Sequence, residues 1–71
     1  MTYELTNEEK ADIINQHIKN LEYSKFNLEL SKIEEDSKTT PDSTMLSSLT
    51  SQLSEVNVKI TALLEELAKV D

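Results

Sequence analysis

The second half of the chain carries an unbroken seven-residue repeat of aliphatic side chains. Its members lie three and four residues apart in alternation, at Leu46, Leu49, Leu53, Val56, Ile60, Leu63, Leu67 and Val70. On an α-helix these positions form one stripe, and a slight left-handed supercoil keeps such a stripe facing a neighbouring helix. Because a row of aliphatic side chains is unfavourable in water, the repeat predicts that this chain packs helix against helix.

The length and the residue types limit what else the chain can form. At 71 residues it is one domain, and chains this short seldom bury enough apolar surface to be stable alone. It contains no cysteine and a single histidine, His17, which excludes a disulfide framework and a Cys/His zinc cluster. The absence of glycine removes phosphate-binding glycine loops, and the acidic residues do not have the spacing of a calcium loop. We expect no cofactor and no metal.

The charge balance argues against two classes of partner. The net charge is −7, and all seven basic residues are lysines. Nucleic acids and anionic membrane surfaces attract basic proteins, so we expect neither as a partner. The start of the chain, Met1-Thr2-Tyr3-Glu4, lacks the features of a signal peptide, and no stretch approaches the roughly 20 apolar residues of a membrane span. These features predict a soluble, cytoplasmic protein.

Signals for helix ends divide the chain into two helices of similar length. Thr6 and Glu9 have the spacing of a capping box, which predicts a first helix over residues 7–35. Residues 36–40 form the expected connection. A second helix then covers residues 41–70, and both helices are about 45 Å long at 1.5 Å per residue.

Pro41 marks the change from one helix to the next, since the residue before a proline avoids helical angles. We expect Thr40 to cap the second helix and Pro41 to be its first residue. Residues 37–54 are rich in Ser and Thr, so a linker is the alternative interpretation, but the aliphatic repeat begins inside this segment and favours a helix. The predicted fold is all-α, an antiparallel two-helix coiled-coil hairpin forming one domain over residues 1–71.

The first helix carries two apolar stripes on different faces. One stripe is expected to face the second helix and contains Ile14, Ile18, Leu21 and Leu28, interrupted by Lys25 and Lys32. The other stripe lies about 120–180° around the helix and consists of Tyr23, Phe26, Leu30 and Ile33. One partner helix cannot cover both. Leu64 likewise lies outside the main stripe of the second helix.

The hairpin predicts a register between its helices. With the turn near Thr39, Leu21 should lie opposite Val56, and Ile14 opposite Leu63. The predicted hairpin core comprises Ile14, Ile18, Leu21, Leu28, Leu46, Leu49, Leu53, Val56, Ile60, Leu63 and Leu67.

The surplus apolar surface predicts self-association, with a dimeric four-helix bundle as the favoured form. The expected subunit interface comprises Tyr23, Phe26, Leu30, Ile33 and Leu64. Aromatic residues are favoured anchors of protein interfaces, so we interpret Tyr23 and Phe26 as interface residues rather than as a ligand platform.

Catalysis is not expected. Carboxylate pairs such as Glu8 with Asp12 and Glu34 with Glu35 occur, but acid–base chemistry needs such groups in a dry cleft with perturbed pKa values. Charged residues on helices usually form a solvated face. His17 is interpreted as a residue at the edge of the core rather than as a pH-sensitive contact or a ligand.

Two segments resemble a known group of proteins. These are Gln16-His17-Ile18-Lys19-Asn20-Leu21-Glu22-Tyr23, continuing through Asn27-Leu28-Glu29-Leu30, and Val58-Lys59-Ile60-Thr61-Ala62-Leu63. They resemble small uncharacterised helical proteins encoded by tailed phages that infect marine cyanobacteria. The resemblance covers most of the chain but includes no catalytic or binding motif. It implies a phage protein, located in the host cytoplasm or the virion, that acts in virion assembly or on a host target.

The sequence therefore predicts a non-enzymatic protein–protein interaction module. The favoured function is a structural or assembly component that partners with itself and with a host or virion protein. The alternative is an adaptor or inhibitor that binds a host protein through an exposed helical face. An acidic mimic of DNA is a less favoured alternative, because the acidic residues are interleaved with lysines.

Overall fold

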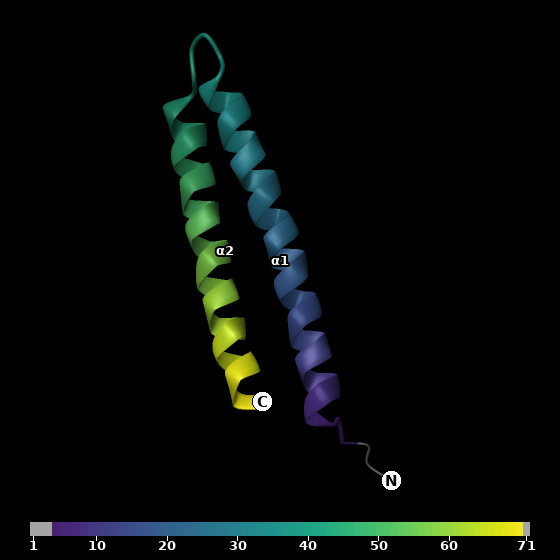
Figure 1. Cartoon of the computed structure of the whole chain (residues 1–71). Helices are drawn as coiled ribbons and strands as arrows, with labels where there is room; N and C mark the ends of the chain where they lie inside the picture. The colour runs from purple at the N-terminus through teal and green to yellow at the C-terminus, as the bar shows by residue number, and fades with distance from the viewer. Residues whose placement is uncertain (1–3, 71) are drawn as a thin grey trace.

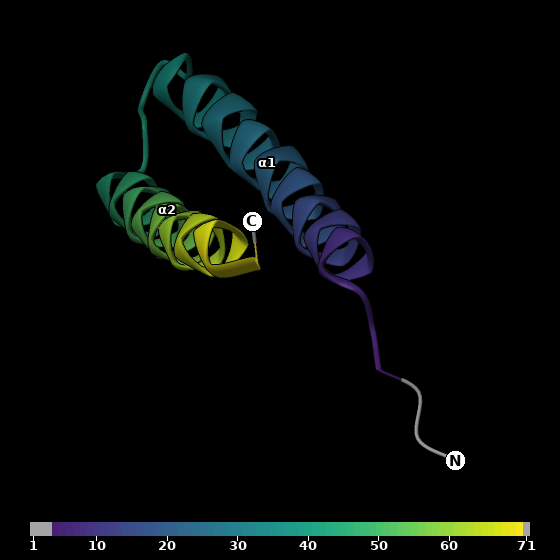
Figure 2. The same ribbon diagram turned by 60° about the horizontal axis from the view of Figure 1, so that its bottom comes forward.

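The structure is a computed structural model that describes residues 4–70, and in this part of the chain it contains two α-helices and no strand. Helix α1 spans Asn7–Asp36 and helix α2 spans Ser43–Val70. They run antiparallel and lie side by side in two views (Figures 1 and 2). The prediction of a helical hairpin is confirmed. The segment Met1-Thr2-Tyr3, on which the expectation of no signal peptide rests, lies outside the described residues.

The first turn of α1 is held by the capping box that the sequence predicts. The Thr6 hydroxyl accepts a hydrogen bond from the Glu9 backbone N–H at 3.1 Å, and the Thr6 backbone N–H donates to Glu9 Oε1 at 2.9 Å. The hydrogen bond from the Thr6 backbone N–H, followed by the contribution of the Thr6 hydroxyl, lowers the pKa of Glu9. The box satisfies backbone donors that the first helical turn leaves without a partner.

The beginning of α2 differs from the prediction that Thr40 is the cap and Pro41 the first helical residue. The helix begins at Ser43, and Asp42 precedes it. One carboxylate oxygen of Asp42 accepts from the backbone N–H groups of Thr44 at 2.9 Å and Met45 at 3.2 Å. A carboxylate is a strong cap because it accepts from these N–H groups and its negative charge suits the positive end of the helix.

The two helices pack along a single seam. All eight members of the α2 repeat are buried or half-buried, and Leu49 and Ile60 are the apolar residues that are buried within residues 4–70, with 7 % and 8 % of their surface exposed. On α1 the half-buried side chains include Ile14, Ile18, Leu21 and Leu28. Every residue predicted for the hairpin core is thus at least half-buried.

The register between the helices is shifted by about one to two helical turns from the prediction, at 3.6 residues per turn. Leu21 lines the same groove as Lys59 and Leu63, and Ile14 lines the same groove as Val70, whereas the sequence predicted Leu21 opposite Val56. The connection explains the shift, because it runs over residues 37–42 rather than 36–40 and its centre lies further along the chain. Neither described helix has an apolar segment that meets the requirements for crossing a bilayer.

We expect Ile60→Ala to lower the free energy of unfolding by about 2–4 kcal/mol, because it removes apolar contacts at the seam and leaves a cavity. Val58→Ala is the matched control: Val58 is 66 % exposed two residues away, and its truncation should change this free energy by less than about 0.5 kcal/mol. Urea denaturation followed by circular dichroism, at one protein concentration, measures both values. Equal losses for the two variants would contradict the single-seam packing.

Candidate interaction surface

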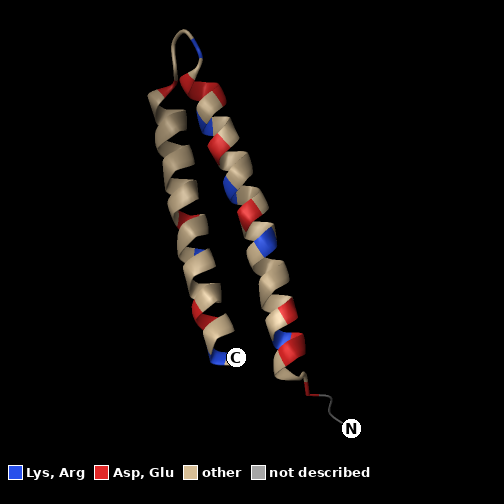
Figure 3. Cartoon of the chain, in the orientation of Figure 1, with Lys and Arg blue, Asp and Glu red and all other residues tan. Residues whose placement is uncertain are grey.

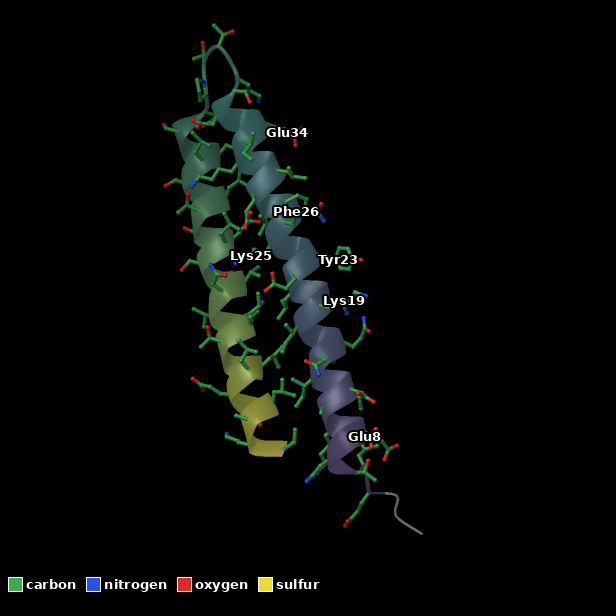
Figure 4. All side chains as sticks on the ribbon, in the orientation of Figure 1. Glu8, Lys19, Tyr23, Lys25, Phe26 and Glu34 are labelled. Atoms are coloured by element: carbon green, nitrogen blue, oxygen red, sulfur yellow. The ribbon has the colours of Figure 1, made fainter. Side chains whose placement is uncertain are left out.

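Four large apolar side chains lie exposed in series on α1. The exposed fractions are 64 % for Tyr23, 61 % for Phe26, 40 % for Leu30 and 62 % for Ile33. We call these four residues the α1 outer stripe. Figure 4 shows the Tyr23 ring directed away from α2. The structure therefore brings together four of the five residues that the sequence assigns to an interface.

The helical repeat explains why α2 does not cover this stripe. Seam residues Leu21 and Leu28 are half-buried, and the outer stripe starts two residues after Leu21, on the far side of the helix. A neighbouring helix covers an arc of roughly 100°, so α2 can cover the seam alone. The outer stripe needs a different cover.

Leu64, the fifth predicted interface residue, lies on α2 and is 51 % exposed. Other exposed apolar residues, such as Ile13, Met45 and Val58, are separated from one another along the two helices. Isolated exposed apolar residues are normal on protein surfaces. The outer stripe is different because its four members follow one another at helical spacing.

Charged side chains lie at both ends of the outer stripe. Lys19 and Glu22 line a shallow groove of about 290 Å³ together with Tyr23 and Phe26, and Figure 4 shows Lys19 on the same side of α1 as Tyr23. At the other end, the last turn of α1 carries the exposed acidic residues Glu34 and Asp36 and no basic residue. The ion pairs among residues 4–70 are Lys38–Glu35 and Lys69–Glu66, so Lys19 is not paired within the described chain.

Glu35 has a role that the sequence analysis missed. Its side chain is buried, with 6 % of the residue exposed. Oε1 accepts a hydrogen bond from the Asp42 backbone N–H at 3.0 Å, and Oε2 lies 2.5 Å from Lys38 Nζ. Glu35 thus ties the end of α1 to the residue that caps α2. One signal was present in the sequence, since Glu35 follows Leu28 by seven residues and so falls on the seam stripe.

The surroundings of Glu35 favour its charged form. The hydrogen bond from Lys38 lowers the pKa of Glu35 most, followed by the bond from the Asp42 backbone N–H. The same contact with Glu35 raises the pKa of Lys38.

The remaining residues singled out for chemistry do not form a site. His17 is exposed and lies at the rim of an open groove of about 450 Å³ between the helices, beside Leu21 and Lys59. Glu8 and Glu34 are exposed near opposite ends of α1 (Figure 4). No three His, Asp or Glu side chains within the described part of the chain gather as metal ligands.

Protonation of Glu35 should destabilise the hairpin. Because the pKa of Glu35 is lowered on folding, its stabilising effect is complete above the ordinary pKa of glutamate, about 4.3, and is lost as the pH falls through the folded-state pKa. We expect Glu35→Gln to lower the free energy of unfolding at pH 7, and the difference from wild type to shrink below about pH 4.

Urea denaturation at several pH values measures this difference. Glu34→Gln is the control, because the carboxylate of Glu34 is next to Glu35 in the sequence but is exposed. A wild type and Glu35→Gln that are equally stable at pH 7 would show that the charge of Glu35 does not stabilise the turn, since the glutamine oxygen can still accept from the Asp42 N–H.

Comparison of this chain with protein-family models, curated proteins and solved structures finds no match. The function must therefore be argued from the exposed residues themselves. Among these, the α1 outer stripe is the feature most suited to binding, because it is apolar, aromatic and not covered by the rest of the hairpin.

Proposed function

We propose that this hairpin is a non-enzymatic interaction module that assembles with itself through the α1 outer stripe, forming a dimer of four helices. It serves as a structural or assembly component. The observation that supports this function is the exposure of Tyr23, Phe26, Leu30 and Ile33 on one face of the single chain.

The small core of the hairpin supports the same proposal. Within residues 4–70, two apolar residues are buried and none of the side chains is fully buried, while one aromatic side chain alone can bury about 150–250 Å². Tyr23 and Phe26 are each more than 60 % exposed. Contiguous apolar patches of a few hundred Å² commonly mark interaction sites. Covering this patch with a second copy would add apolar burial that two helices cannot supply alone.

We extend the proposal to a phage setting, because residues 16–30 resemble small proteins of tailed phages. In that setting the dimer acts as a small structural element of the particle or of its assembly, in the host cytoplasm or the virion. Its further partner is a virion or host protein.

The alternative is an adaptor or inhibitor that keeps the outer stripe free for a host protein. The same exposed residues support it, and the oligomeric state separates the two functions. A DNA mimic has less support. Figure 3 shows that acidic residues on α1 alternate with lysines, and α2 carries no charged residue over positions 43–54. A mimic of DNA needs acids gathered on one face.

We expect wild-type protein to sediment as a dimer and Phe26→Asp to weaken this dimer at least about 30-fold. A buried charge in place of an aromatic anchor removes at least about 2 kcal/mol of binding free energy. Val58→Asp is the matched control, because Val58 is also exposed, at 66 %, but lies on α2. Its dissociation constant should equal that of the wild type.

Analytical ultracentrifugation over a range of concentrations measures these constants, and circular dichroism verifies that each variant stays helical. A wild type that remains a folded monomer at the highest concentration contradicts self-assembly. A monomer that binds a purified host protein, and loses that binding with Phe26→Asp, supports the adaptor instead.

A further inference from the structure

Acidic side chains border the α1 outer stripe along one side. Glu22, Glu29 and Asp36 are seven residues apart, so they follow one line along α1. Each lies three or four residues from Phe26 or Ile33, a spacing that makes side chains neighbours on a helix surface. In the structure Glu22 lines the same shallow groove as Phe26. The stripe is therefore an apolar face with a row of carboxylates at its edge.

These carboxylates have no ion-pair partner inside the described hairpin. Neither ion pair of residues 4–70 includes Glu22, Glu29 or Asp36. Lys25 and Lys32 lie three or four residues from these acids, but on the seam side of them, and they take part in no ion pair of this part of the chain either. Three acidic side chains at the edge of the stripe thus remain to interact with a partner.

The end of α1 adds negative charge beside Ile33. Its last turn carries Glu34 and Asp36, both exposed, and no basic residue. The carbonyl groups of a last helical turn form the negative end of the helix dipole, where cations are favourable. Lys38 follows the helix but is paired with Glu35. This end of the stripe therefore favours a positively charged neighbour.

The charges distinguish two kinds of cover for the stripe. A second copy of α1 brings the same acids to the contact, and like charges across an interface weaken it. A helix with lysine or arginine beside its own apolar stripe brings the opposite charge and covers the same apolar residues. Lys19 opposes such a helix at one end of the stripe, against three acids along its edge. Charge complementarity favours the basic helix.

On these grounds we infer that the α1 outer stripe is the docking surface for a basic amphipathic helix of a partner protein, which binds it more tightly than a second copy does. This inference rests on the proposed use of the stripe in self-assembly and names a further occupant of the same surface. The dimer is then the form of the chain without this partner, and the basic helix displaces one hairpin from the other.

Two synthetic peptides test which charge fits the stripe. Each is about 18 residues long, or about 27 Å as a helix, with leucines at alternating three- and four-residue spacing. The positions beside the leucines are lysine in one peptide and glutamate in the other. Fluorescence anisotropy of the labelled peptides at low salt measures their dissociation constants. We expect the lysine peptide to bind at least about 100-fold more tightly than the glutamate peptide.

Paired variants separate docking on the stripe from general attraction between a basic peptide and an acidic protein. The double variant Glu22→Gln, Glu29→Gln should bind the lysine peptide about 10-fold more weakly at low salt. The control Glu55→Gln, Glu65→Gln removes the same charge from exposed positions of α2 and should weaken binding by less than about 3-fold. Equal losses for the two double variants would show attraction to the net charge alone and would overturn the inference.

The row of acids should affect the two occupants of the stripe in opposite directions. Because the acids oppose a second copy, we expect Glu22→Gln, Glu29→Gln to tighten the dimer about 3-fold at low salt while it weakens peptide binding. Sedimentation measures the dimer constant. A dimer that this double variant weakens would show that the acids support the contact between copies, which overturns the preference for a basic helix.

Phe26→Ala tests the apolar part of the contact without adding a charge. It should weaken binding of the lysine peptide at least about 30-fold. Val58→Ala, at an equally exposed position on α2, should leave binding unchanged, and circular dichroism verifies that both variants stay helical. A Phe26→Ala variant that binds like the wild type would show that the peptide lies elsewhere on the hairpin.

Sedimentation with and without the lysine peptide distinguishes failure of this inference from failure of self-assembly. A dimer that the peptide converts into a complex of one hairpin with one peptide supports both. A wild type that is monomeric without peptide overturns self-assembly, while the peptide constants still decide the docking. A dimer that persists at saturating lysine peptide, or equal binding of the two peptides, overturns the inference and leaves self-assembly in place.

Discussion

The packing of two helices along one seam is the constraint on which the rest of this structure depends. A helix presents an arc of roughly 100° to one neighbour, and α2 uses its entire aliphatic repeat on this contact. No second face of α1 can reach the same neighbour. Apolar residues on the far side of α1 therefore remain in water. The α1 outer stripe is a direct consequence of a two-helix architecture combined with two apolar faces on one helix.

The turn between the helices is made without glycine, so other residues must satisfy the backbone groups at the helix ends. Helices often end at a glycine with a left-handed backbone, yet this chain contains no glycine, and none of the described residues has a positive φ. Backbone and side-chain groups near the turn supply the hydrogen bonds instead. The Ser37 backbone N–H donates to the Ile33 carbonyl at 3.0 Å, its hydroxyl donates to the same carbonyl, and Glu35 accepts from Asp42. Two helix ends thus share one compact set of polar contacts.

This arrangement gives the two faces of α1 different roles. Its seam face includes charged residues, since Lys25 is half-buried and Glu35 buried, while its outer face carries the aromatic side chains. In the second half of α1, the face that α2 does not cover is therefore more continuously apolar than the seam.

The local pattern of residues in the sequence was sufficient to predict several features of the structure. The capping box at Thr6, the two helices, the aliphatic seam of α2 and the grouping of Tyr23 with Phe26 all follow from residue spacing, because helical periodicity is a property of the chain itself. The predicted cap at Thr40 was wrong because proline at a first helical position is a general preference. A carboxylate one residue later provided stronger hydrogen bonds, and the helix began after it.

The register of the two helices and the burial of Glu35 were decided by the folded hairpin and could not be predicted from the sequence. Register depends on where the connection lies, and a connection over residues 37–42 rather than 36–40 moved the helices past each other relative to the prediction. Glu35 becomes buried only when the chain reverses and brings the Asp42 N–H to its carboxylate. Spacing along a sequence determines which residues share a face, whereas contacts between residues on either side of a turn exist only after the chain has folded back.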